Sequence, residues 1–344
     1  MLGLELAYWQ ESILRGLGIL AAVLLPAGTF VYVFLFKMVS FMQSRLGPME
    51  AGPYGSMQLL AEVGKFLQKE DLVPDRADRT LFKIAPYLVV GTVLLTYLVV
   101  PFGPDMVFID NEYFGTGIFF ALAVSSISVI GIIVAGWASA SKYSLLGALR
   151  GAGQLIAYEL PLVLSVVGVV IQAGSLDLQR MVVAQAEGEI FGYGGLGNPF
   201  LLTQIIGLLI FIIAMQAELA QTPFDMPVAE SELVAGYMTE YTGLRFLLFF
   251  IGEFASAGAL SAIAATMFLG GWWLPGLDLD ADYMNVVGPV VLLAKMMIFG
   301  GLIFFVRFTY PRFREDQLQR FAWKVLIPLA LVNITATGIL KVVF

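Results

Sequence analysis

Long runs of apolar residues alternate with shorter polar stretches along the whole chain, and this pattern predicts membrane-spanning helices. A helix needs about 20 apolar residues to cross a hydrocarbon layer about 30 Å thick. Runs of this length occur near residues 13–36, 82–102, 117–137, 158–174, 200–217, 244–269, 284–306 and 322–341. We therefore expect an all-α, polytopic membrane protein with about eight transmembrane helices, forming a single membrane domain over residues 1–344.

The composition supports this interpretation and narrows the chemistry. Hydrophobic residues make up 59% of the chain and charged residues 13%, whereas soluble domains are about a quarter charged. Cysteine and histidine are both absent, which excludes disulfides, Ser-His-Asp triads, the usual haem and iron–sulfur ligands, and the common zinc and copper sites. The net charge of −7 argues against nucleic-acid binding. The candidate chemistry therefore rests on carboxylates, Arg, Lys, Tyr and amides, with no metal site.

The positions of the basic residues predict how the chain crosses the membrane. Of its 19 Lys and Arg residues, 15 fall in or beside the odd-numbered connections between the predicted spans, and only Arg15, Arg180 and Lys341 fall on the other side. Loops rich in Lys and Arg stay in the cytoplasm. We therefore expect a multi-pass protein of the cell (inner) membrane with both termini on the outer, periplasmic side.

The first connection contains an amphipathic segment. From Met57 to Leu67 the apolar residues recur at spacings of two to four, which predicts a helix lying at the cytoplasmic surface of the membrane. This helix could be a simple interfacial anchor. Alternatively, it could form the floor of a cavity for a lipid-like substrate, with Arg45 and Lys65 near the polar end.

Glu159 stands at the predicted start of the fourth span. A carboxylate there could be an end group that complements the helix dipole. It could equally be a proton carrier, since an ionisable residue among membrane helices is by default a candidate functional group. The sequence leaves both interpretations open.

The segment from residue 217 to residue 241 holds five carboxylates and neither Lys nor Arg: Glu218, Asp225, Glu230, Glu232 and Glu240. They could be solvated acids in the first turns of a helix. However, the rest of the segment is apolar and aromatic, so we expect the acids to be partly desolvated, with some pKa values raised toward neutrality. Groups of this kind can exchange protons near pH 7. Glu253, inside the next predicted span, could extend the set.

These polar segments resemble the H subunit of proton-pumping NADH:quinone oxidoreductase (respiratory complex I), the counterpart of mitochondrial subunit one. The resemblance covers nearly the whole chain in order. The matching motifs are Arg45-Leu-Gly-Pro48, Gly52-Pro53, Lys69-Glu70-Asp71, Ser141-Lys142-Tyr143-Ser144, Tyr158-Glu159-Leu-Pro161, Pro223-Phe224-Asp225-Met-Pro227, Glu230-Ser-Glu232-Leu, Glu240-Tyr241, Gly270-Gly271-Trp272, Arg307-Phe-Thr-Tyr-Pro-Arg312 and Trp323-Lys324.

The resemblance implies a subunit without a redox centre that couples quinone reduction to proton translocation. It implies a quinone chamber shared with peripheral-arm subunits, and contacts with small neighbouring membrane subunits and with lipid. FMN and iron–sulfur clusters are expected in partner subunits, and this chain is expected to bind no cofactor. The implied quinone residues are Gln43, Arg45, Glu62, Lys65 and Phe224. The implied proton-coupling residues are Glu159, Glu218, Asp225, Glu230, Glu232, Glu240 and Glu253.

The chain also departs from the family pattern. Leu35 and Phe36 replace a Glu-Arg pair, Met49 and Glu50 replace Asn-Arg, Gln221 replaces an arginine, and Val228 replaces an acid. These changes leave the quinone and the electron donor open, so the related anchor subunits of F420H2 dehydrogenases and membrane-bound hydrogenases remain alternatives. An independent proton-coupled secondary transporter is a weaker alternative, because we find no internal repeat and the cytoplasmic loops are large and patterned.

Overall fold

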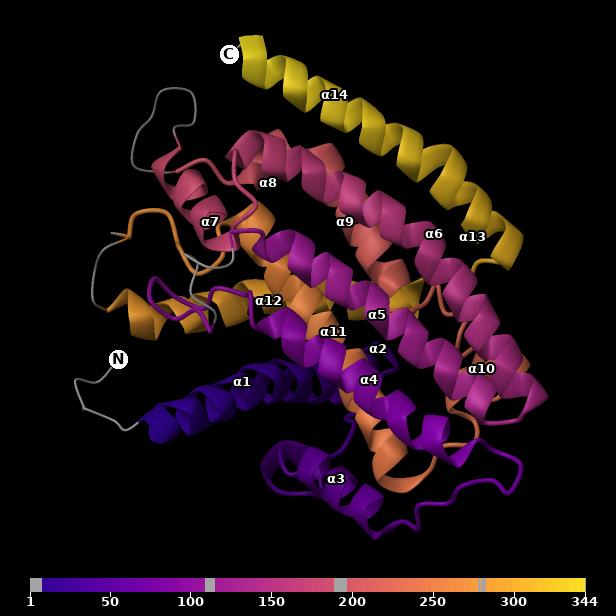
Figure 1. Ribbon diagram of the computed structural model, residues 1–344. Coiled ribbons are helices and arrows are strands. Elements are labelled where there is room, and N and C mark those ends of the chain that lie inside the picture. The colour runs from indigo at the N-terminus through magenta and orange to yellow at the C-terminus, as the bar shows by residue number, and fades with distance from the viewer. Residues whose placement is uncertain (1–7, 109–114, 189–196, 278, 280–282, 344) are drawn as a thin grey trace.

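The protein is a bundle of helices, seen here in a computed structural model (Figure 1). The structure describes residues 8–108, 115–188, 197–277, 279 and 283–343, and only the backbone of residues 8–15 and of Glu230. This part of the chain contains no strand. Seven of its helical segments are long and apolar enough to cross a membrane: Gly16–Met42, Arg79–Tyr97, Gly117–Ala138, Lys142–Ala173, Gly243–Leu269, Met284–Thr309 and Glu315–Val343. The chain is thus an all-α polytopic membrane protein, as the hydrophobic pattern predicts.

The N-terminal half contains the first four long helices. Helix α1 (Tyr8–Phe30) continues through a π-helical stretch, η1 (Val31–Met38), into α2 (Val39–Met42). After the short turn η2 (Pro53–Gly55) come α3 (Gln58–Gln68), α4 (Arg79–Tyr97) and α5 (Gly117–Ala138). Helix α3 confirms the predicted amphipathic helix, and Asp78 caps α4 by accepting hydrogen bonds from the backbone of Thr80 and Leu81.

Helix α6 (Lys142–Ala173) corrects the prediction for the fourth span. The polar stretch before Glu159 was expected to be a connection, but it forms the first half of a helix of 32 residues. At 1.5 Å per residue this helix is about 48 Å long, more than a hydrocarbon core requires. Glu159 therefore lies near the middle of α6 rather than at its N-terminus, which removes the interpretation of Glu159 as a helix-dipole partner.

The predicted span at 200–217 is interrupted. It follows α7 (Leu178–Glu187) and consists of α8 (Phe200–Thr203) and α9 (Ile205–Glu218), which meet at the non-helical Gln204. The Gln204 side chain is buried, accepts a hydrogen bond from Asn333 Nδ2 (3.0 Å) and donates one to Thr337 Oγ1 (2.8 Å). These contacts hold the break in place against the C-terminal helix.

The C-terminal half begins with a non-helical segment that holds only the short helices α10 (Glu230–Leu233) and η3 (Gly236–Met238). Helices α11 (Gly243–Leu269) and α12 (Met284–Thr309) follow, and α13 (Glu315–Phe321), η4 (Ala322–Leu326) and α14 (Ile327–Val343) form one continuous last helix. Helix α14 packs along α6 at one edge of the bundle (Figure 1). The last predicted span is thus extended at its N-terminal end by α13.

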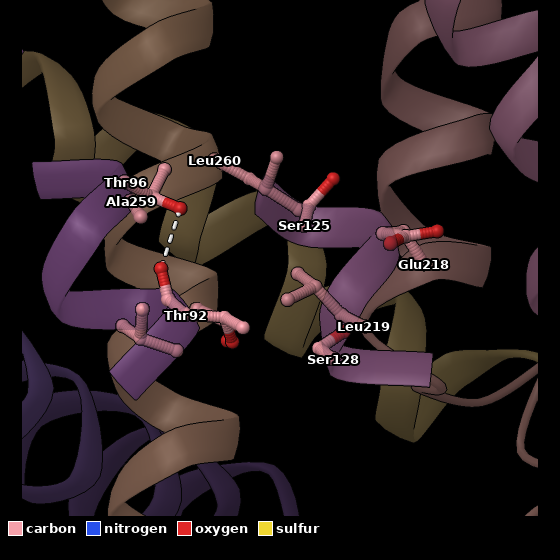
Figure 2. A pocket seen from close by; sticks show the side chains of 10 residues that line it. Thr92, Thr96, Ser125, Ser128, Glu218, Leu219, Ala259 and Leu260 are labelled. Atoms are coloured by element: carbon pink, nitrogen blue, oxygen red, sulfur yellow. Dashed lines mark hydrogen bonds between the residues drawn. The ribbon is translucent and has the colours of Figure 1, made fainter. Parts of the chain in front are cut away.

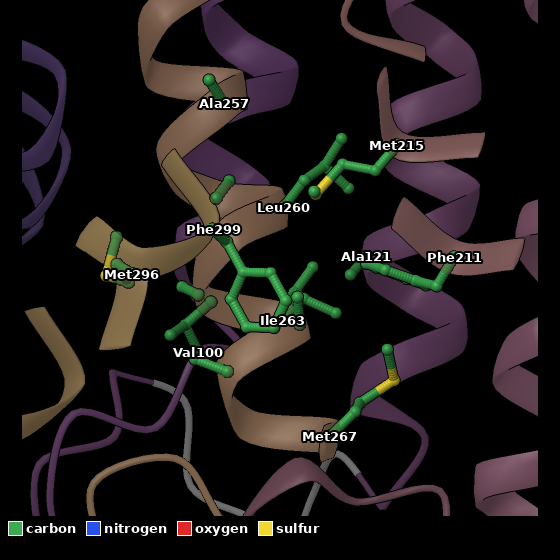
Figure 3. Packing of buried hydrophobic residues seen from close by; sticks show 14 of the residues in the cluster. Val100, Ala121, Phe211, Met215, Ala257, Leu260, Ile263, Met267, Met296 and Phe299 are labelled. Carbon is green, nitrogen blue, oxygen red and sulfur yellow. The ribbon is translucent and has the colours of Figure 1, made fainter. Parts of the chain in front are cut away.

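Helix α11 is the centre of the core. It packs against α1, α4 and α12, and many small residues on its surface allow close approach, as is usual between membrane helices. Figure 3 shows part of this core, in which α11 contributes Leu260, Ile263 and Met267, α9 contributes Met215, and α12 contributes Phe299. This packing fixes the positions of the polar groups on α5, α9 and α12 that surround α11.

Candidate functional site

Two carboxylates come close to each other where α5, α6 and α9 pack together. Glu159 of α6 accepts a hydrogen bond from the hydroxyl of Ser126 on α5. Glu218 is the last residue of α9, and the charge of Glu159 acts on it. The structure therefore brings together two of the predicted proton-coupling residues that are 59 positions apart in the sequence.

Glu218 lines a cavity of about 40 Å³ between α4, α5, α9 and α11 (Figure 2). Its Oε2 atom is buried and has no hydrogen-bond partner. Hydroxyl groups from three helices share the cavity, among them Thr92, Ser125 and Ser128. The cavity is large enough for roughly two or three water molecules.

Glu253 of α11 lies in a second polar group, with Gln221 and Arg307. The Gln221 amide donates from Nε2 to Glu253 Oε1 at 2.6 Å and accepts a hydrogen bond from Arg307 Nη1 through Oε1. Arg307 Nη1 also lies 3.4 Å from Glu253 Oε1. Gln221, which replaces the family's arginine, is thus buried between the two ends of an ion pair, and α12 supplies the cation.

Asp225 and Glu232 are each paired with an arginine from elsewhere in the chain. Arg312 Nη2 lies 2.9 Å from Asp225 Oδ2, and Arg150 Nη1 lies 2.6 Å from Glu232 Oε2. Burial raises the pKa of Asp225, and the Arg312 guanidinium opposes this rise. The hydrogen bond and charge of Arg150 lower the pKa of Glu232, so the expected rise toward neutrality does not occur at that residue.

These pairs form one series of alternating charges, which we refer to as the alternating chain. Arg307 pairs with Glu253 and its charge also acts on Asp225; Arg312 pairs with Asp225 and its charge also acts on Glu232. In order, its members are Glu253, Arg307, Asp225, Arg312, Glu232 and Arg150. The alternating chain ends at an open cleft of about 450 Å³, which is lined in part by Arg150, Glu232 and Arg312.

The two remaining acids of the segment 217–241, Glu230 and Glu240, have no ion pair assigned to them here. Glu230 is the first residue of α10, and its side chain lies outside the described part of the protein. Glu240 is half-buried in the turn that precedes α11. Neither is placed in the alternating chain.

Four of the five predicted quinone residues fall on the stretch of chain that runs from the end of α2 through α3. Arg45 Nε donates to Gln43 Oε1 at 2.8 Å just after α2, and both side chains are exposed. On α3, Glu62 accepts a hydrogen bond from Gln58, and Lys65 is exposed. Helix α3 packs against α11, where Phe66 stacks on Phe246.

Phe224 belongs to a different group. Its ring lies 5.1 Å from that of Tyr158 and 5.5 Å from that of Phe313, measured between centroids. It is buried in a cluster formed by α6, α9 and α13. Its place is therefore beside the alternating chain and not beside Arg45.

At the other positions that depart from the family pattern, the side chains either pack in an apolar cluster or are exposed. Leu35 and Phe36 pack against the main hydrophobic core, and Val228 packs in a smaller cluster with Tyr237 and Phe249. Met49 and Glu50 are exposed in the loop after α2. Apolar packing thus takes the place of charge at three of these positions.

The sequence analysis missed the partners of the carboxylates. The sequence pattern does not single out Ser126, and it counts Arg150, Arg307 and Arg312 among the loop charges; Arg307 and Arg312 also belong to a matching motif, but no pairing with a carboxylate is predicted for them. The one available signal was the absence of basic residues within the acidic segment itself, since buried carboxylates need partners from elsewhere. Within the described residues, no three acidic side chains are grouped closely enough to hold a metal ion.

Comparisons with known proteins show which family the chain belongs to. A family model described as NADH dehydrogenase matches residues 15–338. The H subunit of NADH-quinone oxidoreductase from Brevibacillus brevis is 43% identical over 321 residues, covering 93% of this chain and 90% of that protein. The second H subunit of the same type of enzyme from Syntrophobacter fumaroxidans is also 43% identical, over 329 residues that cover 94% of this chain and 93% of the relative. The chain therefore belongs to the NADH dehydrogenase family, among the H subunits of NADH-quinone oxidoreductases.

Proposed function

We propose that this subunit couples quinone reduction to proton translocation through its buried carboxylates. The observations that carry the proposal are two groups of interacting polar side chains. Glu159 and Glu218 interact where α5, α6 and α9 pack together, and the alternating chain runs from Glu253 to the cleft beside Arg150. In such a series, a change of charge at one group alters the charge state favoured at its neighbours. The series can therefore transmit a change of charge.

The quinone would bind against α3 and the segment that precedes it. A quinone headgroup is neutral when it binds and gains negative charge on reduction, so the nearby cations Arg45 and Lys65 would stabilise the reduced form. The apolar side chains of Leu60 and Leu67 are exposed on α3 and would contact the tail or the surrounding lipid. This site would be completed by a peripheral partner subunit at the cytoplasmic face, and electrons would arrive from that partner's iron–sulfur cluster.

The coupling proposal is tested by removing titratable protons while keeping side-chain size. Glu159→Gln and Glu218→Gln should each lower quinone-linked turnover and proton uptake on the order of 100-fold, the scale of a lost proton-transfer group. Glu187→Gln, at the exposed end of α7, is the matched control and should behave like the parent protein. The measurement is turnover and proton uptake in membrane vesicles after assembly has been verified. Equal and mild effects in all three variants would reject the proposal.

The orientation is proposed from charge alone and has its own test. Because the chain contains no cysteine, single cysteines introduced at Lys69 and Glu187 are specific labelling sites. A membrane-impermeant maleimide should label Lys69→Cys only from the cytoplasmic side and Glu187→Cys only from the outside. The reverse pattern would invert the proposed topology, in which both termini lie on the outer side.

A further inference from the structure

The loop that follows α3 is bonded to the start of α11. Arg245 Nη2 lies 2.9 Å from Asp71 Oδ2. The Thr242 hydroxyl donates a hydrogen bond to the carbonyl of Glu70 at 3.0 Å and accepts one from the backbone N–H of Leu72 at 3.1 Å. We refer to these three interactions as the α3–α11 contact. They join two segments that are 170 or more positions apart in the sequence.

Helix α3 has few other interactions that fix its position. None of its residues is buried. Leu59 packs against the main hydrophobic core, and Phe66 in the last turn stacks on Phe246 of α11 with ring centroids 5.6 Å apart. A segment with little buried surface opens readily unless other bonds hold it. The polar bonds of the α3–α11 contact therefore supply a large share of what holds the end of α3 in place.

The Arg245 side chain is itself held firmly by the bundle. Only 12% of it is exposed, and its guanidinium lies 5.7 Å from the centroid of the Phe82 ring, which stacks on Tyr241. Its Nη1 atom is buried and has no hydrogen-bond partner among the described residues. Asp71 is the carboxylate that balances this charge, and a mostly buried charge is costly to leave unpaired. Arg245 is thus a fixed point to which the loop after α3 is attached.

We propose that Arg245 and Asp71 are positioning residues for quinone binding. They act through α3, since they fix its last turn and with it Lys65, which directly precedes Phe66. A cation displaced by about 1 Å from its productive place loses much of its effect on a bound substrate. Neither Arg245 nor Asp71 needs to touch the quinone. The inference rests on the proposed function in one respect: the quinone binds against α3.

The first test is the kinetics of Arg245→Met, which removes the charge and keeps an apolar stem. The KM for a soluble quinone analogue should rise about tenfold while kcat at saturating quinone stays close to the parent value. Arg245→Lys should restore most of the loss, because the pair consists of one N···O contact that an ammonium group can also make. Asp71→Asn should resemble Arg245→Met, and the double variant should be no worse than either single variant.

Thr242→Val tests the same contact without changing a charge. It removes both hydrogen bonds from Thr242 to the loop, so the KM should rise in this variant as well. Thr335→Val is the matched control, because Thr335 is an exposed threonine of α14 whose hydroxyl donates to Leu331 O of the same helix. Its KM should equal that of the parent complex. Electron transfer to an artificial acceptor verifies assembly in every variant.

Hydrogen–deuterium exchange in the assembled complex separates this proposal from the proposed quinone site. The backbone amides of α3 should exchange faster in Arg245→Met than in the parent complex and in Thr335→Val. Unchanged exchange and KM in Arg245→Met, with quinone reduction lowered in Arg45→Ala, would overturn the positioning role and leave the quinone site standing. Faster exchange with an unchanged KM would overturn both, because α3 would then move without any effect on the quinone.

Discussion

Arg312 Nη2 lies 2.9 Å from Asp225 Oδ2, although 87 residues separate the two in the sequence. The pair ties the loop after α12 to the non-helical segment after α9, and Arg312 adds a hydrogen bond to Ser231 at 3.2 Å. Only 23% of the Arg312 side chain and 18% of the Asp225 side chain are exposed. The ion pair is therefore only partly screened by solvent, and it joins two segments that are distant in the sequence.

Arg312→Gln should destabilise the complex and make its stability more sensitive to pH. Removing one partner of this largely buried ion pair should lower the free energy of unfolding by roughly 1–3 kcal/mol. The loss is smaller than for a fully buried pair because some water reaches these side chains. Burial already raises the pKa of Asp225, and removing Arg312 raises it further. A carboxyl with a raised pKa in the folded state loses stability as pH rises through the interval between its ordinary and raised values. The variant's deficit in melting temperature should therefore be larger at pH 8 than at pH 5.

The double variant Asp225→Asn/Arg312→Gln provides the control for this prediction. Since it leaves no unpaired charge, most of the lost stability should return and the added pH dependence should disappear. A melting curve of the double variant that matches Arg312→Gln alone would mean that Arg312 acts through packing and not through Asp225.

Gln221 and Arg307 allow a test in which the positively charged side chain is moved from position 307 to position 221. Gln221→Arg should impair assembly, because it places a second guanidinium beside Arg307 with Glu253 as the shared carboxylate. The double variant Gln221→Arg/Arg307→Gln moves the cation from α12 to the family's usual position and should restore assembly. Assembly is measured as the yield of intact complex in detergent. Equal yields for the single and double variants would show that the site does not depend on its net charge.

Two glycines of α6 offer a matched pair for testing how the acidic segment docks. A Cβ added at Gly147 would lie 2.7 Å from the carbonyl oxygen of Pro227, whereas one at Gly153 would meet only Gln319 Nε2, at 3.9 Å. Ala is favoured over Gly in a helix by about 1 kcal/mol. Gly153→Ala should therefore leave stability unchanged or raise it, while Gly147→Ala should lower the melting temperature and turnover. Similar results for both would argue against tight docking of the segment on α6.

Arg45→Ala should lower quinone reduction by about tenfold while electron transfer to an artificial acceptor stays intact. The acceptor takes electrons upstream of the quinone site, so it reports on assembly and electron input. Arg180→Ala is a suitable control, since Arg180 is an exposed arginine on α7. A parallel fall in both activities for Arg45→Ala would assign the residue to assembly and reject it as a quinone contact.

The sequence by itself determined the class of the protein, the approximate places of seven of the eight predicted apolar spans, and the family, but not the interruption of the span predicted at 200–217. These depend on local composition, because a membrane span must be long and apolar wherever it packs. Helix α3 was predictable for a similar reason, since its periodicity is a property of consecutive residues. Carboxylates in an apolar segment were equally visible as candidates.

Tertiary structure alone decided how those carboxylates are used. The alternating chain joins Glu253, Asp225 and Glu232 to arginines from α6, α12 and the loop after α12, and no local pattern encodes such pairings. The break at Gln204 depends on Asn333, which is 129 residues away. The cavity that Glu218 lines exists only where α4, α5 and α11 meet the end of α9. Charge balance in a low-dielectric interior is set by spatial neighbours, so it follows from how the helices pack and not from the order of residues along any one of them.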